Sequence, residues 1–241
     1  MNWKLFALLW SAGLPGIVAL VWVIVPALPS AQPLPAPPSV IMVVSALQSA
    51  LLLAIAVFAG CRLAPLIGLQ APLSSAWLAG APLRHILRAQ LSAAGAGGLL
   101  GTAILWGYTR FMPAALQEPA PLPLIVRVLY GGINEELLLR WGLMSLLAWL
   151  LWRVCQRGEG ALSPAMAWMA IIVSAVAFGI GHLPAASVLL GGLNLHLMLY
   201  IIAANAAFGL VAGYLFWKRG LEAAILAHGF AHAGFFMISG R

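Results

Sequence analysis

The chain has 241 residues, of which 63% are hydrophobic and 7% are charged, and its formal net charge is +7. A soluble domain carries about 25% charged residues, so this composition and a mean hydropathy of +1.04 exclude a water-soluble globular protein. The basic residues stand singly between apolar runs, which excludes a clustered nucleic-acid-binding surface and is typical of membrane topology signals. The sequence therefore predicts an all-α, polytopic transmembrane helical bundle that forms a single membrane domain.

Apolar stretches of about 20 residues, the length that crosses a bilayer, recur along the chain. We expect seven spans, of which the third is rich in Ala and Gly and suited to close helix packing, at residues 3–28, 38–60, 86–108, 122–152, 163–183, 193–217 and 221–238. The number rises to eight if residues 66–83 or 184–192 also enter the membrane. The pair Gly131-Gly132 can break or kink the long fourth segment.

The membrane domain divides before the fourth span. Residues 1–121 hold three N-terminal spans with their loops, and residues 122–241 form the region that carries the polar motifs. The first apolar run also resembles a signal peptide, with a candidate cleavage site (Pro-Ser-Ala) at residues 29–31. However, the run is longer than the roughly 7–15 residues of a signal-peptide core, which favours a transmembrane span.

Basic residues distribute unevenly between the two ends of the predicted spans. With the N-terminus inside, the inner side receives most of them: Lys4, Arg62, Arg84, Arg88, Arg153, Arg157, Lys218 and Arg219. The opposite side receives Arg110 and Arg241. Because positively charged loops stay in the cytoplasm, we expect a cytoplasmic N-terminus and an outward C-terminus, in a bacterial inner (plasma) membrane.

Two adjacent carboxylates lie inside the fourth span. The chain has no aspartate, and three of its glutamates fall in predicted loops or at helix ends, where water can solvate them: Glu118, Glu159 and Glu222. Glu135 and Glu136 instead lie deep in an apolar segment, together with Arg140. Each ionised group at mid-bilayer costs about 2.5–3.5 kcal/mol, so this cluster indicates a specific role.

Helical spacing gives the two carboxylates different neighbours. Glu136 and Arg140 are four residues apart and share a face, so they can pair. Glu135 points about 100° away from Glu136. Two interpretations stay open at this point. The three residues form a structural ion-pair network that joins helices, or Arg140 holds Glu136 while Glu135 acts as a general base.

Histidines in later spans add to the same candidate site. His182 ends the fifth span, whereas His228 and His232 lie four residues apart on one face of the last span. Ionisable residues inside spans mark a transport pathway or an active site. His85 lies among loop arginines and His196 near the start of a span, so we interpret both as having no part in the site.

The polar residues form three motifs in chain order, one on each of three predicted helices. These motifs are Glu135-Glu136-x-x-x-Arg140, Phe178-x-x-x-His182 and His228-x-x-x-His232. Their pattern resembles the signature of the CPBP (ABI) family of membrane proteins, which includes the type II CAAX prenyl endopeptidases and bacteriocin-processing proteins. The segment from Asn205 to Gly209 resembles the Gly-rich helix of that family, and the resemblance covers about residues 122–238.

This resemblance implies an intramembrane endopeptidase that hydrolyses a peptide bond of a membrane-anchored or exported peptide or protein. Glu135 would activate the attacking water, and His228 would help to hold that water. His182 and His232 would polarise the substrate carbonyl or stabilise the oxyanion. The other matching residues would orient and support this set: Glu136, Arg140, Phe178 and Asn205.

One position departs from the family pattern, because His232 stands where the family has Asn or Asp. His232 can still donate a hydrogen bond to an oxyanion, as Asn would. It also adds a candidate metal ligand beside His182 and His228. We expect a metal-free glutamic mechanism that requires no cofactor, in part because the sequence holds no His-Glu-x-x-His motif. The alternative is a Zn²⁺ ion held by the three histidines and a carboxylate.

The depth of the site residues poses a geometric condition. Helical rise leaves His182 close to the outer surface, while Glu135 and His228 lie nearer mid-depth. The site closes only if the fifth span ends early or tilts inward, and Gly179 and Gly181 permit local bending. Under the predicted orientation, the cavity opens toward the outer half of the membrane.

Two other classes of function remain open. A non-proteolytic immunity or scaffold protein would keep the buried polar network for packing. A proton-coupled transporter would use it as a relay, although the sequence shows no convincing internal repeat. The expected partners are a peptide or protein substrate and the lipid bilayer, and not nucleic acid.

Overall fold

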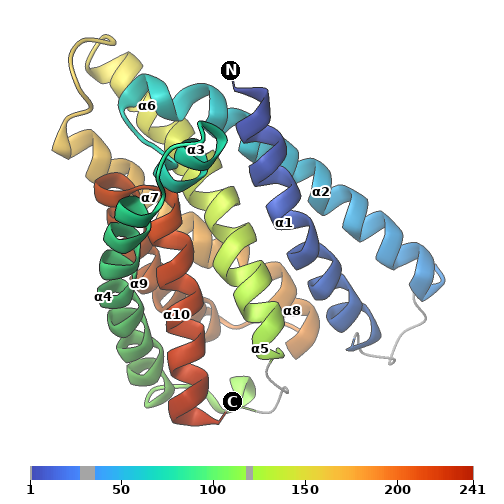
Figure 1. Ribbon diagram of the computed structural model, residues 1–241. Coiled ribbons are helices and arrows are strands. Elements are labelled where there is room, and N and C mark those ends of the chain that lie inside the picture. The colour runs from blue at the N-terminus through green and yellow to red at the C-terminus, as the bar shows by residue number, and fades with distance from the viewer. Residues whose placement is uncertain (1, 28–35, 118–121, 241) are drawn as a thin grey trace.

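The computed structural model describes residues 2–27, 36–117 and 122–240, which are helical and contain no strand (Figure 1). The first half of the chain forms α1 (Trp3–Ile24), η1 (Val25–Ala27), α2 (Pro38–Leu63), η2 (Ala64–Ile67), α3 (Pro72–Leu78), α4 (Arg84–Thr109) and η3 (Ala114–Leu116). The second half forms α5 (Leu124–Val126), η4 (Arg127–Glu135), η5 (Leu137–Met144), α6 (Ser145–Cys155), α7 (Pro164–Gly181), α8 (Leu183–Leu190), α9 (Leu195–Arg219) and α10 (Leu221–Ser239).

Six helical segments among the described residues are long and apolar enough to cross a membrane. They are Trp3–Ile24, Pro38–Ile67, Leu124–Cys155, Pro164–Leu190, Leu195–Arg219 and Leu221–Ser239. The chain is therefore an all-α integral membrane protein, as its composition predicts. Helices α3 and α8 have 7 and 8 residues and are too short to add a further span.

The predicted third span forms α4, a helix of 26 residues that is less apolar than the six segments above. It packs along α10, beside which it lies in Figure 1. A Cβ atom added at Gly101 would lie 2.7 Å from Cβ of Ala231, and one added at Gly97 would lie 3.1 Å from Cβ of Ala227. The Ala- and Gly-rich face thus allows the close approach of the two helices.

The fourth predicted span continues as one helical segment from Leu124 to Cys155. Gly131-Gly132 does not break it, because the chain there widens into π-helical turns over Arg127–Glu135 and again over Leu137–Met144. Such turns are uncommon and frequently occur at functional sites. This segment lies at the centre of the bundle, where η4 contacts α1 and α10, and η5 contacts α2, α7 and α9 (Figure 1).

The two chain ends lie at opposite ends of the bundle (Figure 1). Because the long helices alternate in direction, the end that holds the N-terminus also collects the predicted inner cations, from Lys4 to Arg219. Arg110 follows α4 at the other end, and Arg127 begins η4 on that same side. The membrane orientation itself stays a prediction, and the candidate cleavage site at 29–31 lies outside the described residues.

The expectation that Glu222 is solvated is wrong. Its side chain, in the first turn of α10, is only 7% exposed and accepts a hydrogen bond of 2.8 Å from the backbone N–H of Ser74. The segment before α3 folds against the start of α10, since the N–H of Leu221 also donates to the carbonyl of Gln70. Glu159 is exposed as expected, and Glu118 lies outside the described residues.

Candidate active site

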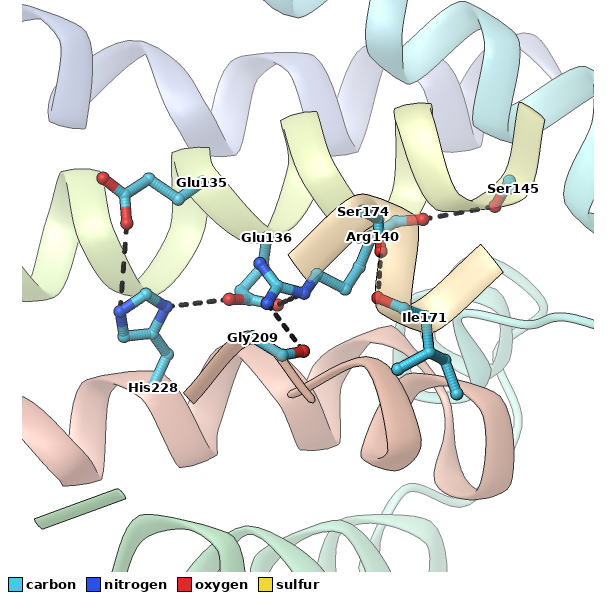
Figure 2. A network of polar contacts seen from close by, with 8 residues as sticks. All are labelled: Glu135, Glu136, Arg140, Ser145, Ile171, Ser174, Gly209 and His228. Atoms are coloured by element: carbon cyan, nitrogen blue, oxygen red, sulfur yellow. Dashed lines mark hydrogen bonds and ion pairs between the residues drawn. The ribbon is translucent and has the colours of Figure 1, made fainter. Parts of the chain in front are cut away.

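Glu136 and Arg140 form a buried ion pair beneath the cavity-facing residues of the site (Figure 2). Both side chains are 0% exposed, and Arg140 Nε lies 3.3 Å from Glu136 Oε2, which confirms the pair predicted from their spacing. Arg140 Nη2 also donates a hydrogen bond of 3.0 Å to the carbonyl oxygen of Gly209 in α9. A Cβ atom at Gly209 would lie 3.2 Å from that nitrogen, so glycine lets the guanidinium approach the α9 backbone.

The pair fixes the orientation of His228 in α10. His228 Nδ1 lies 2.8 Å from Glu136 Oε1 and donates to it, because a carboxylate that pairs with arginine accepts hydrogen bonds. The other ring nitrogen, Nε2, then faces Glu135 Oε2 at 3.9 Å (Figure 2). Glu136 and Glu135 therefore contact opposite edges of one imidazole ring.

His182 approaches Glu135 from the end of α7. Its Nδ1 donates a hydrogen bond of 2.8 Å to the carbonyl oxygen of Phe178, and its Nε2 lies 3.7 Å from Glu135 Oε1. This helix ends at Gly181 after 18 residues, and α8 follows as a separate short helix. His182 thus lies at the junction of α7 and α8, where its ring reaches Glu135.

A ring of aromatic contacts holds the two histidines and the arginine. The ring of Phe178 lies edge-on to His182 at 4.9 Å and to His228 at 6.0 Å between centroids. Arg140 Cζ lies 4.9 Å from the centroid of the same phenyl ring, within the range of a cation–π contact. His232 stacks on His228 with centroids 4.9 Å apart and planes inclined by 24°.

Glu135 faces a cavity of about 380 Å³. Its side chain is 16% exposed, in contrast to Glu136. The cavity extends toward the end of the bundle that holds the C-terminus, where Thr109 and Met112 line it. Its polar or titratable lining consists of Tyr108, Thr109, Arg127, Tyr130, Glu135, His182, Tyr200, Asn205, His228 and His232.

The structure brings together every residue that the motifs single out. Seven of them meet in the contacts above, and the Asn205 amide donates to the carbonyl of Ile201 within the cavity wall. His85 and His196 are exposed and lie outside the cavity. Arg127 also lines the cavity but was not predicted from the sequence. The signal that could have found it is its spacing, since Arg127, Gly131 and Glu135 follow one another at intervals of four residues and all line the cavity.

The predicted histidine ligands do not form a metal site in this arrangement. Within the described ranges, no group of three His, Cys, Asp or Glu side chains has a geometry that could hold a metal ion. We therefore derive no chemical step through a metal.

Fold and site together define a polytopic membrane protein with a glutamate–histidine centre enclosed in its helix bundle. Residues 117–234 match the family model described as Type II CAAX prenyl endopeptidase Rce1-like, and this match supports the resemblance to the CPBP/CAAX protease-like family. The family supports a membrane endopeptidase activity of the CAAX type in general. No curated protein and no solved structure matches the chain.

Proposed function

We propose that this protein is an intramembrane endopeptidase in which Glu135 is the general base. The observation that carries the proposal is the convergence of two imidazole nitrogens on one cavity-facing carboxylate. His182 Nε2 and His228 Nε2 lie 3.7 and 3.9 Å from the two oxygens of Glu135. A structural ion-pair network accounts for Glu136 and Arg140. Among the residues that the structure describes, however, it leaves Glu135 with no ion-pair partner other than histidine.

The separations suit a water molecule rather than direct hydrogen bonds. Contacts beyond about 3.5 Å are too long for a hydrogen bond and are commonly bridged by water. In neutral His228 the proton resides on Nδ1, which leaves Nε2 as an acceptor. One water can then donate to Glu135 and to His228 Nε2, and both of its donors are committed. Its oxygen lone pairs remain directed at a substrate carbonyl carbon in the cavity.

Peptide hydrolysis follows from this arrangement. Glu135 takes a proton from the water as the water oxygen bonds to the carbonyl carbon, and the carbonyl oxygen becomes an oxyanion. The C–N bond then breaks, the proton passes from Glu135 to the leaving amine, and the new acid and amine depart. Because the site is buried within the bundle, hydrogen bonds to the oxyanion are stronger there than they would be in water.

Three side chains of the cavity are the candidate oxyanion donors. His232 can donate from a ring nitrogen, and Asn205 retains one amide proton beyond its bond to Ile201. His182 donates to an oxyanion only when Nε2 also carries a proton, because its Nδ1 proton is committed to Phe178. In that protonated form His182 also forms an ion pair with Glu135.

The position of the cavity favours a class of substrate. Cations gather at the N-terminal end of the bundle, which the positive-inside rule assigns to the cytoplasm. The cavity extends toward the opposite end, so a peptide that is exported or anchored in the outer half of the membrane can reach Glu135. This orientation disfavours a cytoplasmic prenylated substrate.

A cleavage assay tests the proposal. Purified protein in lipid nanodiscs is incubated with a library of N-acylated peptides. Mass spectrometry should detect new peptide termini with wild-type protein and none with Glu135→Gln. Activity should persist in 1,10-phenanthroline after metal removal. Loss of activity in the chelator, with recovery on adding Zn²⁺, would instead support the zinc alternative. No cleavage by a folded wild-type protein of any library member would favour the scaffold class.

Substitution of Gly131 should reduce catalysis without harming the fold. A Cβ atom there would lie 2.9 Å from His232 Nε2 and 3.7 Å from Glu135 Oε2. Gly131→Ala therefore displaces His232 by a few tenths of an ångström and narrows the cavity floor. We expect kcat/KM to fall about tenfold, because small misplacements of reacting groups are costly. Ala is the better helix former by about 1 kcal/mol, so stability should not fall.

Gly95→Ala is the matched control for this prediction. Gly95 is also a helical glycine, in α4, and no atom lies within 4 Å of its added Cβ. The control should keep wild-type kcat/KM. Equal activities of Gly131→Ala and Gly95→Ala would show that His232 does not need its observed position.

A further inference from the structure

Arg127 is a cation inside the cavity that the proposed chemistry does not use. It begins η4, three residues after the start of the central helical segment at Leu124. Its guanidinium carbon lies 5.9 Å from the ring centroid of Phe236, and the side chain lines the same cavity as Glu135. Its Nε atom is shielded from solvent and has no hydrogen-bond partner in the described part of the chain.

No described carboxylate balances this charge. The salt bridges of Glu135 and Glu136 are to His182, His228 and Arg140, within the described residues. An ionised side chain in the membrane region requires a partner or access to water, and by default it marks a functional site. Arg127 therefore offers the cavity an unpaired set of donors.

The position of Arg127 relative to Glu135 indicates which part of a bound peptide would meet the guanidinium. The two residues are eight apart, at the two ends of η4. They are at most about 12 Å apart along the axis, the α-helical value, which π-helical turns shorten, and both face the cavity. An extended peptide covers that length in about three or four residues. Arg127 lies toward the end of the bundle where Thr109 and Met112 line the cavity. A peptide whose carbonyl sits at Glu135 thus passes the guanidinium a few residues from the scissile bond.

We propose that Arg127 is a specificity-determining residue that binds a carboxylate of the substrate peptide. A planar guanidinium pairs with a carboxylate through two parallel hydrogen bonds, which adds direction as well as affinity. The inference rests on the proposed function, because it places the peptide in the cavity with its scissile bond at Glu135. The carboxylate is either the free C-terminus of the peptide or an Asp or Glu side chain.

A peptide carboxylate suits the site better than a lipid phosphate. Arg127 Nε is shielded from solvent, and the guanidinium shares its cavity with Glu135, His182 and His228. Whatever binds at Arg127 therefore lies beside the proposed catalytic groups. A lipid held there would occupy the path of the substrate.

Binding to the non-cleaving Glu135→Gln protein in nanodiscs of neutral lipid tests this inference apart from catalysis. The probes are N-acylated peptides of random internal sequence that lack acidic side chains, each made as the C-terminal acid and as the C-terminal amide. A third set carries the amide with one internal Glu at successive positions. Charged hydrogen bonds contribute about 1.5–3 kcal/mol, so the favoured acid form should bind at least about tenfold more tightly than the neutral amide.

Adding Arg127→Gln should remove that preference and leave amide binding unchanged, whereas Arg127→Lys should keep part of it. Arg110→Gln is the matched control, because Arg110 is an exposed cation at the same end of the bundle and does not line the cavity. A preference for the C-terminal acid identifies the terminal carboxylate as the ligand, and a preference for one Glu position identifies the side chain.

Equal binding of acidic and amidated peptides, or a preference that survives Arg127→Gln, would overturn the inference. So would an Arg127 effect that appears only in nanodiscs containing phosphatidylglycerol, which would identify a lipid ligand. Likewise, if Glu118→Gln alone reproduced the Arg127→Gln result, the cation would be balanced within the chain. Arg127-dependent binding without any cleavage by the wild-type protein would instead count against the proposed function, and it would leave Arg127 as a residue that binds a peptide carboxylate.

Discussion

Glu135→Gln should lower kcat by about 10²–10⁴-fold, the range that a positioned general base supplies, with no loss of folded protein. The amide keeps the shape of the carboxylate but cannot take a proton from water. In the described part of the chain the Glu135 carboxylate makes no hydrogen bond, and it lies 3.7 and 3.9 Å from His182 and His228, so the fold depends little on its charge. Steady-state cleavage of a peptide found in the library measures kcat, and thermal unfolding in detergent measures the fold.

Glu159→Gln serves as the control for that result. Glu159 is an exposed carboxylate that does not line the cavity and is distant in sequence from the residues that do. It should retain wild-type kcat. If the Glu135→Gln protein unfolds at a much lower temperature than the wild-type protein, Glu135 has a structural role in the ion-pair network. Cleavage at the wild-type rate by a folded Glu135→Gln protein would exclude the general-base role.

Arg140→Met should lower the free energy of unfolding by about 3–5 kcal/mol, the penalty for removing one partner of a buried ion pair. The substitution leaves Glu136 buried without a cation, although both side chains are 0% exposed in the wild-type protein. It also removes the hydrogen bond to the Gly209 carbonyl and the contact with the Phe178 ring. Denaturant titration in mixed micelles measures the change.

A double-mutant cycle separates the unpaired charge from lost packing. Glu136→Gln with Arg140→Met removes both charges, so the double mutant should be more stable than Arg140→Met alone. It should still lose activity, because Glu136 holds His228 through the 2.8 Å hydrogen bond at Nδ1. A single Arg140→Met variant within about 1 kcal/mol of wild type would contradict the view that the pair is a buried, mutually dependent unit.

Much of the architecture could be predicted because the bilayer constrains local sequence strongly. Apolar length predicted seven spans. Six of them correspond to helical segments of the described residues that are long and apolar enough to cross a membrane, and the other forms the less apolar helix α4. Spacing of four residues predicted the Glu136–Arg140 pair and the shared face of His228 and His232. These properties depend on a single helix, and a sequence pattern records them directly.

Other features depend on contacts between helices, which no single segment specifies. Gly131-Gly132 suggested a break, but packing against α1 and α10 leaves a continuous helix with π-helical turns. Glu222 was expected to be a solvated helix-end residue, yet α3 packs against it and the backbone N–H of Ser74 donates to its carboxylate. The junction of α7 and α8 at His182, which lets that side chain reach Glu135, was open in the sequence for the same reason.

Mapping of new peptide termini in host cells tests the central claim most directly. The membrane and secreted proteomes of cells that carry wild-type protein are compared with those of cells that carry equal amounts of Glu135→Gln. We predict a set of termini that is present with wild-type protein and absent with Glu135→Gln, in membrane-anchored or exported proteins. Identical terminus maps from two well-expressed proteins, under conditions where deletion of the protein has a phenotype, would contradict proteolysis and support a scaffold function for the buried network.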